Sequence, residues 1–154
     1  MTGVQTCALP IFWAKSSDNH LRSIFRRIFV SVHEAYNGLN EAWGPDARDL
    51  PGYREALIEV AVALNAAQSA YDIRQDVERA GKGEIEVLFS VYDTGNHRVT
   101  MPFAGTGPAP EVQDGRSIRL AYAPTHPREF STLASQIARS LRPGATPEAA
   151  PATA

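Results

Sequence analysis

The chain has 154 residues, with 15 basic side chains, 17 acidic side chains and a formal net charge of −2 at pH 7. This length suits one domain with a sizeable hydrophobic core, and the near-neutral charge excludes a global electrostatic attraction to nucleic acid or to an anionic membrane. The longest mostly apolar stretch, residues 56–67, is interrupted by Glu59 and Asn65. It is too short to span a membrane, which takes about 20 apolar residues.

The first eleven residues, MTGVQTCALPI, resemble an in-frame translation of a sequencing adapter. The alternative is a secretory signal peptide, but its positively charged first segment is missing, because no basic residue precedes Lys15. We therefore expect residues 1–11 to be an artefact and residues 12–142 to be a single domain that has lost its native N-terminus. A native targeting signal would have been lost with that segment.

The only cysteine, Cys7, lies within those eleven residues. The rest of the chain therefore offers no disulfide, thiol nucleophile or cysteine-type zinc site, and a cytoplasmic location is expected. Thirteen arginines stand against two lysines. We interpret this bias as the mark of a GC-rich genome rather than of thirteen phosphate contacts.

Residues 19–43 have the apolar periodicity of a long amphipathic helix. The apolar side chains repeat in alternating steps of four and three residues, at Leu21, Phe25, Ile28, Val32, Ala35, Leu39 and Ala42. Gly44 and Pro45 are expected to end this helix, because glycine favours the C-terminal cap and proline cannot continue the hydrogen-bond ladder.

A second helix is predicted over residues 51–80 and is stopped by Gly81 and Gly83. Two long helices joined by a short loop are expected to lie antiparallel. A row of small side chains would let them approach closely, at Ala56, Ala63 and Ala70. Between residues 56 and 67 the helix is apolar around much of its circumference, which predicts neighbours on more than one side. The sheet, a partner subunit or the lost N-terminal element could supply the second neighbour.

After residue 83 the apolar period changes to two, which indicates β-strands. Strands are predicted over residues 84–92, 98–104 and 116–122, and Pro102 weakens the second of them. Pro127 suits the first turn of a final helix, which has apolar side chains at core spacing, at Phe130, Leu133, Ile137 and Leu141.

The predicted fold is therefore α+β, with a long antiparallel helical hairpin, a three-stranded antiparallel β-meander and a C-terminal helix. Residues 143–154 are rich in proline and alanine, so we expect a disordered tail.

The leading functional hypothesis is a non-enzymatic interaction or assembly protein that acts through the helical hairpin. The partner would be a second copy of the chain or another protein subunit. It would bind the side of the second helix that the three predicted strands are too few to cover, at Ile58, Ala61, Val62 and Asn65.

The second hypothesis is a nucleic-acid-associated protein of a phage or mobile element. Two groups of arginines would contact phosphates if the fold brought them together. The first group is Arg22, Arg26 and Arg27, and the second is Arg116 and Arg119. The alternative is a solvated helix face, because no nucleic-acid-binding motif accompanies the arginines.

The third hypothesis is a small hydrolase that uses Asp93 and His97 as an acid–base pair. These residues flank a short turn, and the alternative is that they serve only the turn. His33 and Glu34 lack the second histidine of an H-E-x-x-H motif, because position 37 is Asn37. We expect no metal and no cofactor.

Overall fold

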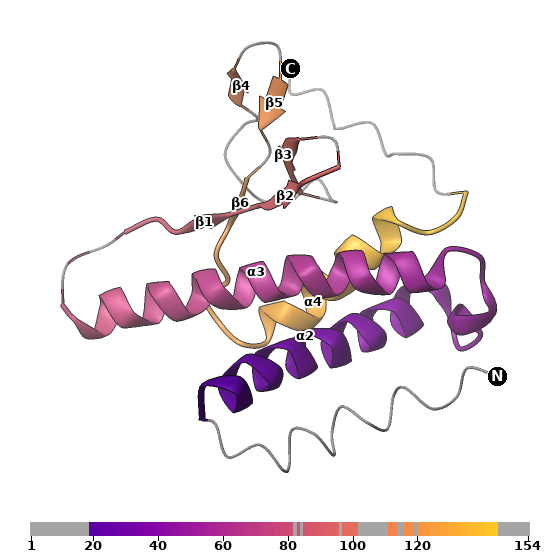
Figure 1. Cartoon of the computed structure of the whole chain (residues 1–154), viewed down its shortest axis with the longest axis horizontal. Coiled ribbons are helices and arrows are strands. Elements are labelled where there is room, and N and C mark those ends of the chain that lie inside the picture. Colours follow the sequence, from indigo (N-terminus) through magenta and orange to yellow (C-terminus); the bar gives the residue numbers. More distant parts are fainter. Residues whose placement is uncertain are drawn as a thin grey trace.

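The computed structural model describes residues 19–81, 83, 85–95, 97–101, 111–113, 116–118 and 120–144. The expected adapter-derived segment, residues 1–11, and most of the expected tail, residues 145–154, lie outside this description. The described part combines three α-helices with six short strands (Figure 1). The predicted α+β class is confirmed.

Helices α2 (Asn19–Trp43) and α3 (Tyr53–Arg79) confirm the two predicted long helices. Helix α2 ends where Gly44 takes a φ of 102°, a left-handed conformation that side-chain-bearing residues rarely adopt. A short 3-10 helix, η1 (Ala47–Asp49), follows. The alanine row of α3 is buried, as its spacing predicted, because small side chains allow close packing of neighbouring helices.

Helix α4 (Glu129–Ser140) confirms the predicted final helix and packs against both α2 and α3. In Figure 1, α2 and α3 lie close to each other near the loop that joins them and diverge toward the N-terminus of α2, while α4 starts between them and passes behind α3. The indole Nε1 of Trp43 donates a buried hydrogen bond to the carbonyl oxygen of Ala138 at 2.6 Å. This bond joins the last turn of α2 to the last turns of α4.

The closest approach of α2 to α4 is at Gly38. A Cβ atom at this position would lie 2.7 Å from both the Cβ and the carbonyl carbon of Ala134. The absence of a side chain therefore sets the distance between the two helices. The core forms around this contact, and its fully buried side chains include Leu39, Val60, Leu64 and Ile137.

The strands form three antiparallel pairs rather than a simple meander. They are β1 (Leu88–Phe89) with β6 (Ala121–Tyr122), β2 (Val91–Asp93) with β3 (Arg98–Thr100), and β4 (Glu111–Gln113) with β5 (Arg116–Ile118).

The difference from the expected meander has two causes. The first expected strand is divided at Ser90, so that its two parts pair with different strands, β6 and β3. Residues 111–113, which lie between the second and third predicted strands, form an additional strand, β4, that pairs with β5. Helix α3 contacts β1 and β2, so the strands and α4 are the additional neighbours that its apolar circumference predicted.

We expect Gly38→Ala to destabilise the protein by about 1–3 kcal/mol, because the new methyl group overpacks the contact with Ala134. Alanine is more favourable than glycine in a helix interior by about 1 kcal/mol. A loss of stability in Gly38→Ala would therefore come from the packing conflict. Urea denaturation followed by circular dichroism would measure it. Asn37→Ala, at the exposed neighbouring position, is the control and should be neutral or slightly stabilising. A Gly38→Ala variant as stable as the parent would contradict the proposed contact.

Candidate interaction surface of the helical hairpin

The apolar face of α2 is covered along only half of its length. Ala35 and Leu39, in the C-terminal half, are completely buried. Ile24 and Ile28 lie on the same face two to four turns earlier, yet they are 53% and 46% exposed. The apolar spacing of residues 19–43 therefore gave the direction of this face, and only its C-terminal half is buried.

The geometry of the three helices explains this change. Helices α3 and α4 cover α2 near the Gly38 contact, and α2 diverges from α3 toward its N-terminus, where Ile24 and Ile28 stay exposed (Figure 1). Phe29 and Val32 add to the exposed apolar surface there, and the ring of Phe29 stacks on His33 with 6.4 Å between centroids. Sequence periodicity could not find this surface, because it gives the same signal for both halves of the helix.

The predicted interface residues of α3 share one face. Ile58 is 56% exposed and Val62 is 47% exposed, while Asn65 is also exposed and Ala61 is half-buried. Ile73 continues the same face toward the C-terminal end of α3. The predicted interface is thus a continuous stripe that the described strands and α4 leave uncovered.

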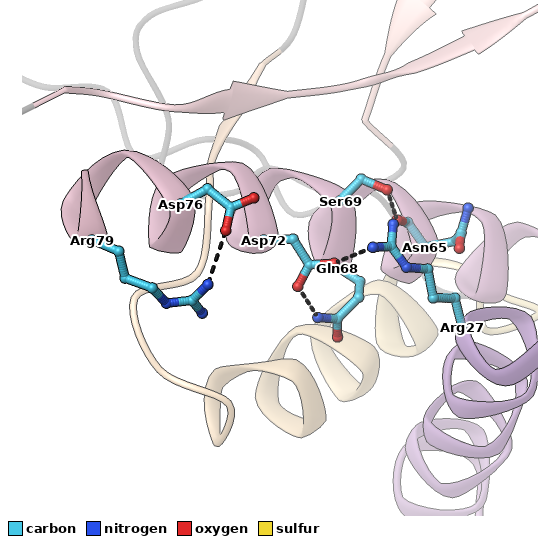
Figure 2. Close-up of polar contacts among 7 residues, drawn as sticks. All are labelled: Arg27, Asn65, Gln68, Ser69, Asp72, Asp76 and Arg79. Carbon is cyan, nitrogen blue, oxygen red and sulfur yellow. Dashed lines mark hydrogen bonds and ion pairs between the residues drawn. The ribbon is translucent and has the colours of Figure 1, made fainter. Parts of the chain in front are cut away.

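One of the predicted nucleic-acid-binding arginines has a role within the fold. The guanidinium of Arg27 on α2 lies 3.0 Å from the carboxylate of Asp72 on α3 (Figure 2). Arg22 and Arg26 are exposed on the same half of α2. Arg116 contributes its backbone to β5, but its side chain and the whole of Arg119 lie outside the described residues.

The turn between β2 and β3 uses both residues of the hydrolase hypothesis. Asp93 Oδ1 accepts a hydrogen bond from the backbone N–H of Gly95 at 2.8 Å. His97 has a φ of 56° and its Nδ1 lies 2.9 Å from the hydroxyl oxygen of Tyr92. These local bonds are typical of a tight turn, and they engage the two side chains with different partners.

Glu59 of α3 has an unusual electrostatic environment next to this turn. Burial raises the pKa of the Glu59 carboxyl group, and the negative charge of Asp93 raises it further. Helix α3 contacts β2, whose last residue is Asp93, and this packing brings the two carboxyl groups into the same region. Glu59 and Asp93 are more than thirty positions apart in the sequence, and no local pattern predicted that they would lie near each other.

Similarity to known proteins supplies no function for this arrangement. No protein-family model matches the chain, and neither a curated protein nor a solved structure is significantly similar to it. In the described part of the chain, no helix has the length and apolar character needed to cross a membrane. The same residues contain no group of three or more potential metal ligands.

Replacement of Glu59 by Gln should stabilise the protein near neutral pH. Because the pKa of Glu59 is higher in the folded than in the unfolded protein, its protonated form favours folding. This contribution is fully present at a pH below the unfolded pKa and is lost as pH rises through the folded pKa. We expect Glu59→Gln to raise Tm by about 1–3 °C at pH 7, with a smaller difference as pH falls toward 4.5, the ordinary pKa of this side chain.

Melting curves at a series of pH values would test this prediction. Glu86→Gln removes the same charge from an exposed residue ahead of β1 and serves as the control. A shift that is independent of pH, or one that Glu86→Gln reproduces, would contradict the coupling of Glu59 to Asp93.

Proposed function

We propose that this chain is a non-enzymatic interaction or assembly protein that associates through its helical hairpin in the cytoplasm. The observation that carries the proposal is the exposed half of the apolar face of α2, centred on Ile28. Contiguous exposed apolar surface of this kind marks sites of protein association in monomers. The predicted stripe on α3, which includes Ile58 and Val62, offers a second apolar surface.

The side chains next to the two surfaces favour a second copy of the chain as the partner. The first four turns of α2 carry Arg22, Arg26 and Arg27, and no acidic residue occurs in this helix before Glu34. On α3, Ile58 lies between two acidic residues, Glu55 and Glu59. Opposite charges across an interface favour the correct partner and orientation.

A two-fold dimer would use both surfaces at once. The start of α2 from each protomer would pack on the α3 stripe of the other, so that the same contact forms twice and the assembly closes. A different protein subunit with an apolar, acidic surface is the alternative partner. The two cases differ in whether the isolated chain associates with itself.

Light scattering of the full chain across a concentration series tests this proposal, with Ile28→Asp as the interface variant. We expect the parent chain to be dimeric and Ile28→Asp to weaken the dimer at least about tenfold, because a charge would be buried in an apolar contact. Val62→Asp should have the same effect from the other surface.

Ser23→Asp is the matched control, because it adds the same charge to an exposed position on another side of α2 and should leave the dimer intact. Circular dichroism would establish that each variant folds, and Ile28 is half exposed, so its replacement leaves the core in place. A parent chain that stays monomeric at all concentrations would refute self-association, as would an Ile28→Asp variant that dimerises like the parent.

A further inference from the structure

A pocket of about 290 Å³ opens where α2, α3 and the start of α4 meet. Its walls include Val30 and Glu34 from α2, Leu64 and Tyr71 from α3, and Phe130 from α4. The volume is at the lower end of the range of small-molecule sites. Its α2 residues follow Ile28 within two turns of the helix, and the ligand proposed below does not require the proposed assembly.

The carboxylate of Glu34 has no hydrogen-bond or ion-pair partner among the described residues. Free N–H groups at a helix N-terminus attract anions, and the start of α4 forms one wall of this pocket. Here those groups are used: the N–H of Arg128 donates to His126 Nδ1, and those of Glu129 and Phe130 donate to backbone carbonyls. The pocket therefore contains a negative charge that no described residue neutralises.

Gln68 adds a second hydrogen-bond acceptor to the pocket wall. Its Nε2 donates to Asp72 Oδ1 at 3.0 Å, and Arg27 holds the other oxygen of the same carboxylate at 3.0 Å (Figure 2). Because a carboxylate only accepts hydrogen bonds, this contact fixes the orientation of the Gln68 amide. Its carbonyl oxygen is left as an acceptor with no donor among the described residues.

The remaining walls suit the body of an organic cation. The rings of Tyr71 and Phe130 meet edge to face with 5.7 Å between centroids. Aromatic faces attract ammonium groups, and apolar side chains such as Leu64 and Val30 cover a hydrocarbon portion. An inorganic cation would find one carboxylate and no further charged ligand here.

From this geometry we propose that the pocket binds a small organic ammonium ion, with Glu34 as its counter-ion and the carbonyl of Gln68 as a second acceptor. The ligand carries only hydrogen-bond donors at its charged end and an apolar group beside it. An anionic ligand is disfavoured, because it would meet Glu34 with no N–H donor to compensate.

Binding of phenethylamine, which is protonated at pH 7, tests the proposal with the full chain. Saturation-transfer NMR and isothermal titration calorimetry would be compared with 2-phenylethanol and phenylacetate, which have the same shape but are neutral and anionic. We expect saturable binding of the amine alone. Glu34→Gln should weaken it by about ten- to a hundredfold, as for the loss of a hydrogen bond to a charged group.

Glu41→Gln removes a carboxylate two turns further along α2 and should leave binding unchanged. Absence of saturable amine binding would overturn the proposal. Equal binding of 2-phenylethanol, or an affinity that Glu34→Gln does not change, would overturn it as well. Because the readout here is ligand binding and not light scattering, failure of this proposal and failure of the proposed dimer are distinguishable.

Discussion

The arrangement of the whole domain depends on the close approach of α2 and α4 at Gly38. At this point the backbone of one helix lies against Ala134 of the other, with no space for a single additional carbon atom. The Trp43 indole bonds to the Ala138 carbonyl one turn away and fixes the same two helices in register. Around this contact α4 packs against both α2 and α3, which also pack on each other, and its position thereby determines which surfaces of the two long helices are covered.

Both candidate functional features follow from that placement. Helix α4 is only 12 residues long, less than half the length of α3, so it cannot cover the full length of α2. Its first turn closes one side of the pocket that contains Glu34, and the turns of α2 that lie beyond it keep their apolar residues at the surface. An apolar helix face that continues past its intramolecular neighbour is a common basis for association between protein chains.

Local patterns in the sequence were sufficient to predict the helices and were insufficient to predict their contacts. The periodic apolar row of α2 and the terminating Gly44 gave the bounds of that helix, because both signals act within a few residues. The contact at Gly38 could not be predicted, because a glycine inside a helix carries no information about the distant alanine that it meets. The prediction of the strand pairs failed for the same reason, since the sequence of a half-buried strand such as residues 88–93 does not specify its partners. In the sequence, Glu34 is only part of an incomplete metal-binding motif. Its place in a pocket depends on how α3 and α4 pack around α2, which the local pattern does not specify.

The Trp43–Ala138 hydrogen bond joins residues that are 95 positions apart in the sequence. This separation matters for folding during synthesis on the ribosome. Helix α2 is synthesised before α4, so in a nascent chain the part of α2 that α4 covers stays exposed until α4 has been made. Long-range contacts of this kind slow folding and prolong the exposure of apolar surface. A chain truncated before α4 would lack an element that covers part of both long helices, and it would be prone to aggregation.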